Sequence, residues 1–224
     1  VLARDLLARN GIETLILNPE ALTYENGVVA HGGRAIDMVY NRLTDFDLSE
    51  PGHAQLRAAL LDEAVVISPA PRHHALYANK RNLIWLSDPD WLKSFGADDA
   101  DRQVLAAIPD TRHVTEDVAD ELWAARRGYF FKPAAGFGSR AAYRGDKLTK
   151  RVWSAILEGD YIAQALVPPT VRAVTVDQEP VTLKYDVRLY TYAGKTLLLA
   201  ARVYQGQTTN FRTSGGGFAP VYQF

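Results

Sequence analysis

Residues 129–142 read YFFKPAAGFGSRAA, and this stretch decides the fold of the chain. Its aromatic start predicts a buried strand that ends at Lys132, and Pro133 favours an extended conformation for that lysine. Gly136 and Gly138 can take positive φ and let backbone N–H groups approach an anion closely. Lys132 is therefore either an anion ligand at a strand end or a lysine that reaches solvent before an ordinary turn.

The glycine spacing excludes two common phosphate loops. No Gly-Lys-Ser/Thr follows, as a P-loop requires, and no third glycine opens a helix, as the dinucleotide-binding fingerprint requires. The surrounding pattern instead predicts a compact ββαβ unit, with strands at 129–132 and 140–144, a helix at 148–158 and a strand at 160–166.

The rest of the chain divides around this unit. Residues 1–71 alternate between helix and strand, and residues 72–128 are mostly helical. The expected elements of the first part are a helix at the start, strands at 14–17, 35–42 and 64–69, a turn at Asn26-Gly27 and a helix at 51–63. An α/β unit that opens on a helix normally has a strand before it, so we expect this chain to be a piece of a longer protein.

The last part reads as an antiparallel sheet. Long strand-like runs at 172–176, 181–192 and 196–204 are separated by turns at 177–180 and 193–194. We therefore predict an α/β (α+β) protein with four parts: a partial α/β domain at 1–71, a helical part at 72–128, a small lobe with the glycine loop at 129–168 and a sheet lobe at 169–224.

Composition narrows the function. The 224 residues carry a net charge of −1, which gives no electrostatic case for binding nucleic acid or an anionic membrane. The strongly apolar stretch at 196–203 is far too short to cross a bilayer, and the start has no signal-peptide pattern. The absence of cysteine excludes disulfides and thiolate metal sites. We expect a cytoplasmic protein, and the oligomeric state is not predicted.

Two further stretches combine strands with polar groups. YIAQALVPP, at 161–169, is an apolar strand with one glutamine that ends at two prolines, which suits either a hinge that holds a planar base or an ordinary edge strand. In YDVRLYTY, Asp186 and Arg188 share one face of a strand, while Val187 and Leu189 are expected to face a core. The acid and the arginine are either site residues or a surface ion pair.

A third stretch, RVYQGQTTNFRTSGGG, follows at 202–217. Arg202 ends a strand, Asn210 lies in a polar loop, and Gly215, Gly216 and Gly217 form an uninterrupted triplet. A loop so rich in donors suits recognition of a carboxylate or a phosphate. The alternative is a flexible connector.

Taken in order, with Lys80 ahead of them, these pieces resemble the ATP-grasp superfamily, and most closely its glutathione-synthetase-like and glutathionylspermidine-synthase-like carboxylate–amine ligases. The matching pieces are NKRNLIWL around Lys80, FFKPAAGFGS, YIAQALVPP, DVRLYTYAGK and RVYQGQTTNFRTSGGG. The resemblance covers most of residues 35–224. It implies an ATP-grasp fold that follows a partial α/β domain.

The resemblance also implies roles for residues. It implies an ATP- and Mg²⁺-dependent ligase that activates a small-molecule or peptide carboxylate as an acyl phosphate, which an amine then attacks. The implied phosphate ligands are Lys80, Lys132 and the loop Gly136, Phe137, Gly138 and Ser139. The implied adenine hinge is Gln164, Ala165, Leu166 and Val167. The implied catalytic residues are Arg188, Arg202 and Asn210, and the implied substrate loop is Gly215, Gly216 and Gly217. A non-catalytic nucleotide-binding module and a plain interaction domain are the alternatives.

The metal site departs from the family pattern. The family holds Mg²⁺ with an acid followed by a Glu-x-Asn strand, and neither follows the glycine triplet here. Asp186 is the acid that we can place near the proposed phosphates, and one carboxylate is a poor site for ions that bridge two phosphates. The ligands lie in missing sequence, or the metal site differs, or the protein binds nucleotide without turnover.

Other polar residues have simpler explanations. Asp45 and Asp47 are expected to form a turn or a helix cap rather than a paired-carboxylate site. His73 and His74 are expected at a solvated helix start rather than around a metal. Arg42 ends a strand of the leading α/β domain, where open sheets place ligands, and is a candidate substrate contact.

Overall fold

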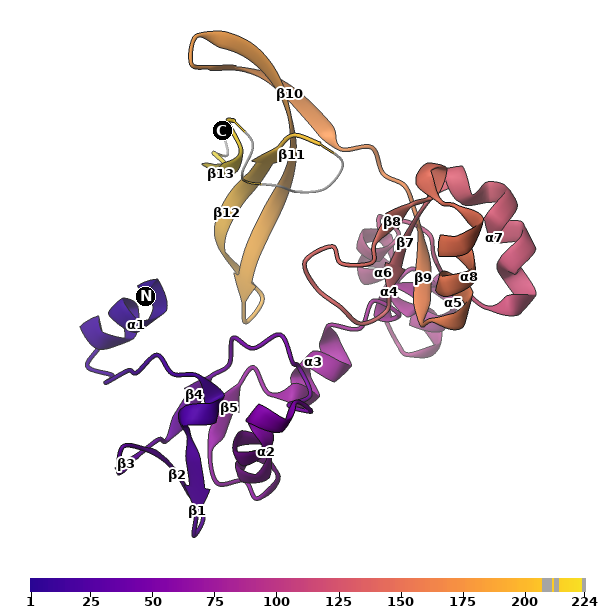
Figure 1. Cartoon of the computed structure of the whole chain (residues 1–224). Helices are drawn as coiled ribbons and strands as arrows, with labels where there is room; N and C mark the ends of the chain where they lie inside the picture. The colour runs from indigo at the N-terminus through magenta and orange to yellow at the C-terminus, as the bar shows by residue number, and fades with distance from the viewer. Residues whose placement is uncertain (207–210, 212–213, 223–224) are drawn as a thin grey trace. The chain divides into compact units, whose positions relative to one another are not determined.

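The computed structural model describes residues 1–206, 211 and 214–222, and it confirms a mixed helix-and-sheet class (Figure 1). The chain forms two compact units. Unit 1 combines Val1–Leu86 with Pro133–Phe137, and unit 2 combines Ser87–Lys132 with Gly138–Phe224. The glycine loop therefore contributes to both units. Within the described part of the chain, no helix is long and apolar enough to cross a membrane.

Unit 1 contains two small sheets and short helices. The Asn26-Gly27 turn is confirmed, because both residues have positive φ (51° and 78°) and join an antiparallel hairpin. Strands β1 (Thr23–Glu25), β2 (Val28–His31) and β3 (Arg34–Ala35) form one sheet, and β4 (Met38–Tyr40) pairs in parallel with β5 (Val66–Ser68). The helices are α1 (Leu2–Arg9), α2 (Ala54–Leu61), α3 (Pro71–Tyr77) and α4 (Asn82–Leu86).

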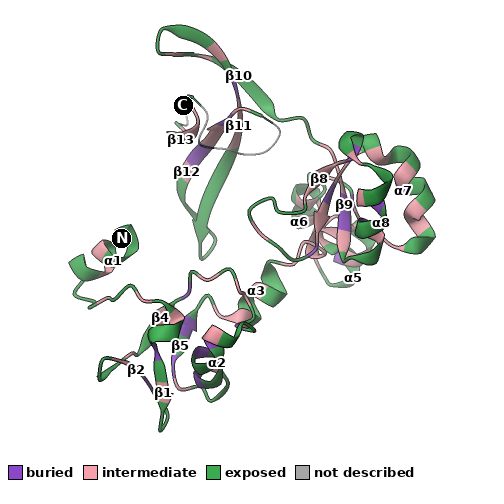
Figure 2. Ribbon diagram, viewed as in Figure 1, coloured by how far each residue is buried: buried purple, intermediate pink, exposed green. Residues whose placement is uncertain are grey.

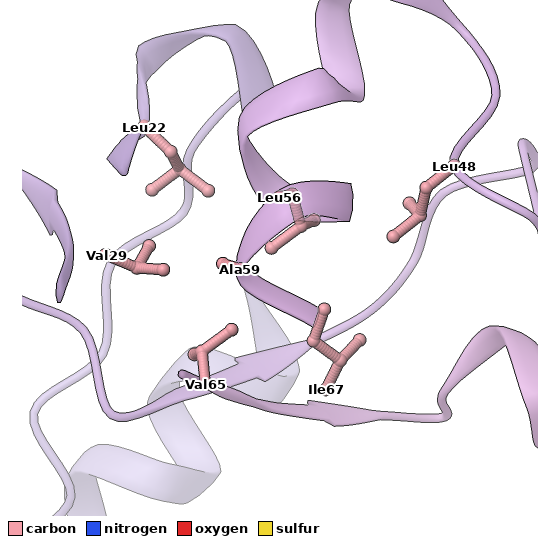
Figure 3. Close-up of a cluster of buried hydrophobic side chains, with 7 residues drawn as sticks. All are labelled: Leu22, Val29, Leu48, Leu56, Ala59, Val65 and Ile67. Atoms are coloured by element: carbon pink, nitrogen blue, oxygen red, sulfur yellow. The ribbon is translucent and has the colours of Figure 1, made fainter. Parts of the chain in front are cut away.

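The core of unit 1 lies between α2 and the strands. Figure 3 shows side chains from β2, α2, β5, the loops between them and the residue before β1 pointing toward one another. The buried residues are Leu22, Val29, Leu48, Leu56, Ala59, Val65 and Ile67. This core holds the carboxyl ends of β4 and β5, from which the chain continues into the segments at Asn41 and Pro69.

The prediction of a strand at 14–17 is wrong. Residues 12–18 have no regular structure, and Ile16 is 61% exposed. A strand needs a neighbour to satisfy its N–H and C=O groups, and an apolar run by itself does not supply one. The strand expected at 35–42 is likewise shorter, because only Met38–Tyr40 pair with β5.

Unit 2 contains the predicted ββαβ unit, whose sheet also includes β6. The sheet order is β6-β9-β7-β8, and the buried side chains of Phe131, Trp153 and Ile156 belong to its core. Figure 2 shows buried stretches of ribbon in β9 and α8. The strands are β6 (Thr111–His113), β7 (Tyr129–Pro133), β8 (Tyr143–Arg144) and β9 (Tyr161–Ala165), and the helices are α5 (Pro89–Ser94), α6 (Asp99–Leu105), α7 (Ala119–Ala125) and α8 (Lys150–Glu158). The second strand begins later than expected, because Ser139 and Ala141 have positive φ and interrupt an extended chain.

The remaining strands form the predicted antiparallel sheet. Its order is β10 (Thr170–Val176), β11 (Glu179–Tyr192), β12 (Lys195–Tyr204) and β13 (Gly217–Pro220). The expectation that Val187 and Leu189 face a core is wrong, because their side chains are 46% and 61% exposed. Alternation along a strand tells which residues share a face, but burial of that face depends on what packs against it.

Candidate functional site

Lys132 lies in β7 at the end of a chain of hydrogen bonds across three strands of unit 2. Its Nζ donates to Oε1 of Gln164 at 2.7 Å, and Nε2 of Gln164 donates to Oγ1 of Thr111 at 3.0 Å. Thr111 is 3% exposed, and its hydroxyl donates to the carbonyl of Pro109 at 2.8 Å. Because each donor has a fixed acceptor, the Gln164 amide is held with its oxygen toward the ammonium.

This arrangement brings together two residues that the sequence singled out separately. Lys132 and Gln164 are predicted phosphate and hinge residues, respectively, and they lie on neighbouring strands. Sequence reasoning missed Thr111. The register of β6 against β9 pairs it directly with Gln164, and only a correct strand alignment could have identified it.

The predicted hinge uses part of its backbone within the fold. The N–H of Ala165 donates to the carbonyl of Asp110, and the N–H of Leu166 donates to the carbonyl of Gly128, both at 2.7 Å. Val167 follows with a side chain that is 63% exposed. A base that binds here has to be recognised by groups other than these two N–H donors.

In unit 1, Lys80 is tied to the glycine loop at two points. Its backbone N–H donates to the carbonyl of Ala134 at 2.9 Å, and its Nζ donates to the carbonyl of Gly136 at 3.3 Å. Burial lowers the pKa of Lys80. Gly136 and Gly138 have φ of 143° and 61°, so the predicted positive φ at both glycines is confirmed.

Phe137, between those glycines, lies against an aromatic stack in unit 1. Its ring meets Phe46 edge to face at 5.4 Å between centroids, and Phe46 stacks on His74 at 3.6 Å. The expectation of a solvated His74 is wrong, because its ring is half-buried beneath an aromatic residue that lies 28 positions earlier. A pocket of about 260 Å³ opens beside the stack and is lined by Asn41, Arg42, Leu43, Thr44, Phe46, Pro69, Ala70, His74 and Phe137.

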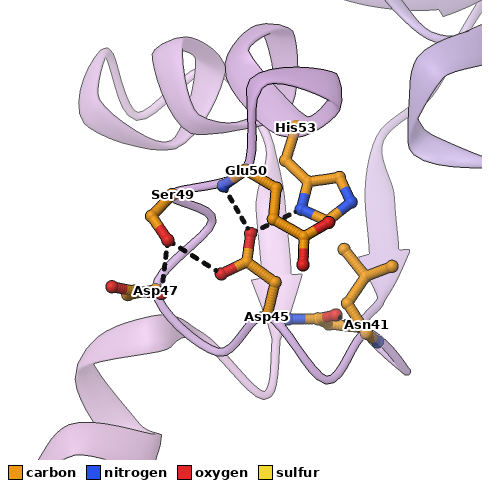
Figure 4. Close-up of polar contacts among 7 residues, drawn as sticks. Asn41, Asp45, Asp47, Ser49, Glu50 and His53 are labelled. Atoms are coloured by element: carbon orange, nitrogen blue, oxygen red, sulfur yellow. Dashed lines mark hydrogen bonds and ion pairs between the residues drawn. The ribbon is translucent and has the colours of Figure 1, made fainter.

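Asp45 accepts hydrogen bonds from the residues that follow it, Ser49, Glu50 and His53 (Figure 4). One of its oxygens accepts from the Ser49 hydroxyl at 3.2 Å, and the other accepts from the Glu50 N–H at 2.9 Å and from Nδ1 of His53 at 2.6 Å. The expected turn role of Asp45 is therefore confirmed. Asp45, Glu50 and His53 offer possible metal-ligand atoms within 4.8 Å of one another, but the hydrogen bonds of Asp45 already account for this cluster.

Substitution of Asp45 by asparagine should destabilise the fold by about 1–3 kcal/mol at pH 7, because a buried acceptor loses charge-assisted hydrogen bonds. Burial acts to raise the pKa of Asp45, but the hydrogen bonds from Glu50 and His53 outweigh it and hold the pKa below its usual value. The ionised carboxylate therefore stabilises the fold fully at pH values well above the pKa of Asp45 in the unfolded chain, about 3.9. This stabilisation is lost progressively as the pH falls below that pKa.

Urea denaturation at pH 7, 5 and 3.5 checks this prediction. The difference in unfolding free energy between the wild type and Asp45→Asn should shrink at the lowest pH. Asp47→Asn is the matched control, because Asp47 accepts only an exposed hydrogen bond from Ser49 among the contacts described. A difference that stays constant with pH would contradict the proposed ionic contribution.

The ammonium of Lys80 also acts on His74. Burial is the larger cause that lowers the pKa of His74, and the positive charge of Lys80 lowers it further. We expect Lys80→Met to raise the pKa of His74, measured by NMR titration of its ring protons. Lys93→Met, at an exposed position of α5, should leave it unchanged. An unchanged or lower His74 pKa in Lys80→Met would show that the charge does not reach the pocket.

Asp186 and Arg202 form a cross-strand ion pair. They lie directly opposite each other on β11 and β12, and Nε and Nη2 of Arg202 donate to the two carboxylate oxygens at 2.6 and 2.8 Å. The hydrogen bond to Asp186 raises the pKa of Arg202. The ion-pair alternative for Asp186 is thus observed, with Arg202 rather than Arg188 as its partner. A metal ion could take this carboxylate only by displacing the guanidinium.

The other predicted residues of this sheet are placed as follows. Arg188 is exposed on the same face of β11 as Asp186. Gly215 lies so close to Val176 and Leu183 that an added Cβ would come within 2.8 Å of the valine. Gly216 follows, Gly217 begins β13, and Asn210 lies outside the described residues.

No protein-family model matches the chain, and no curated protein matches it. Among solved structures the chain is similar to the ATP-grasp ligase PsnB complexed with minimal precursor, at a TM-score of 0.46 and 16% identity over 89% of this chain and 70% of that chain. The chain is also similar to PsnB complexed with a phosphomimetic variant of minimal precursor, Mg and ADP, at a TM-score of 0.46 and 15% identity over 89% of this chain and 70% of that chain. For PsnB complexed with minimal precursor, Mg and ADP, the TM-score is 0.39 and the identity is 18%, over 80% of this chain and 66% of that chain. Similarity at this level does not assign a family.

Proposed function

We propose that this protein is an ATP-dependent ligase that joins a small-molecule or peptide carboxylate to an amine. The observation that carries the proposal is the hydrogen-bond chain from Thr111 through Gln164 to Lys132, at the entry to a glycine loop with positive φ. It gives a fixed cation next to a backbone that an anion can approach closely.

The partner of Lys132 is chemically informative. An ammonium has three N–H donors, and Gln164 takes one of them through a neutral oxygen. A glutamate at that position would add a negative charge beside the ammonium, whereas this glutamine orients the ammonium through a neutral oxygen. An ammonium that is oriented by a neutral amide suits a phosphate ligand.

The proposed reaction has two balanced steps. The substrate carboxylate attacks the γ-phosphorus of ATP, which gives an acyl phosphate and ADP. The amine then attacks the acyl carbon, which forms the amide and releases phosphate and a proton. Lys80, Lys132 and the loop Gly136–Ser139 are the proposed phosphate ligands, and Gln164–Val167 form the proposed adenine hinge.

Arg202, Arg188 and Asn210 are the proposed groups for the acyl phosphate and the substrate carboxylate, with the triplet Gly215–Gly217 beside the substrate. Asp186 holds the Arg202 guanidinium through two hydrogen bonds, which limits its rotation. With both oxygens engaged in this way, Asp186 does not fit a Mg²⁺ site, and we assign no step to a metal that it would hold.

One observation favours a second candidate, a module that binds ATP without turnover. The acid that the sequence placed near the phosphates is the one paired with Arg202. With its carboxylate held by a guanidinium, Asp186 does not offer the oxygen ligands that a Mg²⁺ ion needs, which favours binding of nucleotide over its turnover.

A substrate screen separates the two candidates. The chain is incubated with Mg-ATP and pools of carboxylic acids and amines, and ADP and amide are measured together. The ligase proposal expects ADP and amide in equal amounts, and only when both substrates are present. ATP binding without ADP under any pool would favour the second candidate, and no ATP binding at millimolar concentration would reject both.

A further inference from the structure

The pocket beside His74 in unit 1 has the size for one residue or a small acid. Its volume is about 260 Å³, below the range of about 300–1,000 Å³ typical of sites for drug-sized ligands. A whole nucleotide is larger than this pocket. The size of the pocket therefore favours a ligand smaller than ATP.

The charges around the pocket favour an anion. Arg42 lines it with an exposed guanidinium, and the described lining residues include no acidic side chain. The amide of Asn41 is already engaged with Pro69 and Leu43, so it shapes the pocket rather than binding a ligand. The Lys80 ammonium acts on His74 in the same pocket wall and adds positive potential. Arginine binds carboxylates through two parallel hydrogen bonds.

The walls favour an apolar or aromatic body. The Phe46 ring stacks on His74, the Phe137 ring meets Phe46 edge to face, and Leu43 and Pro69 complete an apolar lining. A flat hydrocarbon group can pack against such rings. A carboxylate at Arg42 and a hydrophobic group against the rings would satisfy both parts of the pocket.

We propose that this pocket binds the carboxylate substrate, as a one-residue-sized acid with an apolar or aromatic body. Arg42 pairs with the carboxylate, and Phe46 and Phe137 contact the body. The assignment to the carboxylate rather than the amine rests on the proposed function. Phe137 lies between Gly136 and Gly138, so the loop assigned to the phosphates also forms one wall of this pocket.

The test uses 3-phenylpropanoate as the probe and 3-phenylpropan-1-ol as its neutral counterpart, both without nucleotide. Each compound is titrated into the protein and followed by NMR. The titration gives the affinity, and the ring-current shift of the His74 ring protons shows whether the compound binds in this pocket. We expect the acid to bind and shift His74, and the alcohol to bind at least ten-fold more weakly. Arg42→Gln should weaken the acid at least ten-fold and leave the alcohol unchanged.

Arg57→Gln is the matched control, because Arg57 is an exposed arginine of α2 that does not line the pocket. Arg42 is exposed as well, so both variants should keep the fold, which the unchanged hairpin signals of β1 and β2 would verify. Equal binding of acid and alcohol, no effect of Arg42→Gln, or no shift at His74 would each overturn the proposal. The probe is tested without ATP, so the two proposals can fail separately. If the protein binds the acid but does not bind ATP, the ligase proposal is refuted and the assignment of an acid-binding pocket is retained.

Discussion

Replacement of Lys132 by methionine should weaken ATP binding by about 10- to 100-fold. A charge-assisted hydrogen bond is worth about 1.5–3 kcal/mol, and each 1.4 kcal/mol is a factor of ten in Kd. Methionine keeps an unbranched apolar side chain of similar length in β7, so the strand should remain intact. It removes the ammonium that lies 5.7 Å from the centroid of the Phe130 ring.

Isothermal titration with Mg-ATP measures this effect. Lys93→Met is the control, since it removes one exposed lysine of α5 and should bind ATP as the wild type does. An unchanged Kd in Lys132→Met would show that the ammonium in β7 is no phosphate ligand.

Replacement of Gln164 by glutamate should weaken ATP binding to a similar degree, by about 10-fold or more. The change is nearly isosteric, but it puts a carboxylate 2.7 Å from the ammonium of Lys132 and a negative charge beside the incoming phosphates. The two groups would form an ion pair that opposes phosphate binding rather than preparing for it.

Gln164→Met separates charge from orientation. It removes the hydrogen bonds to Lys132 and Thr111 without adding a charge, so we expect a smaller loss of affinity than with glutamate. Equal affinities for the glutamate variant and the wild type, by the same titration, would refute the argument that a neutral residue at position 164 favours phosphate binding.

Local patterns in the sequence predicted the elements whose residues carry their own signals. The Asn26-Gly27 turn and the three long strands after Pro169 formed as expected, and the ββαβ unit after Gly128 formed with a shorter second strand. The segment at 14–17 did not, because strand formation depends on a partner that the local sequence cannot specify.

Contacts between distant segments were beyond sequence reasoning. The pairing of Gln164 with Thr111 depends on strand register, and the stacking of His74 on Phe46 depends on how a loop and a helix meet. Arg202 was singled out as a site residue, but its partner Asp186 lies across the sheet rather than along its own strand. Sequence spacing predicts neighbours on one element, whereas these side chains are brought together by tertiary structure.

The most direct test of the proposed ATP site is amide hydrogen exchange with and without Mg-ATP, read peptide by peptide. The proposal predicts slower exchange, by about 10-fold or more at 100 times the Kd, in the peptides that cover residues 129–142 and 161–167. The peptide of the β1–β2 hairpin should exchange at the same rate in both samples. Unchanged exchange in the glycine loop and the hinge, at ATP concentrations that saturate binding elsewhere, would contradict the proposed site.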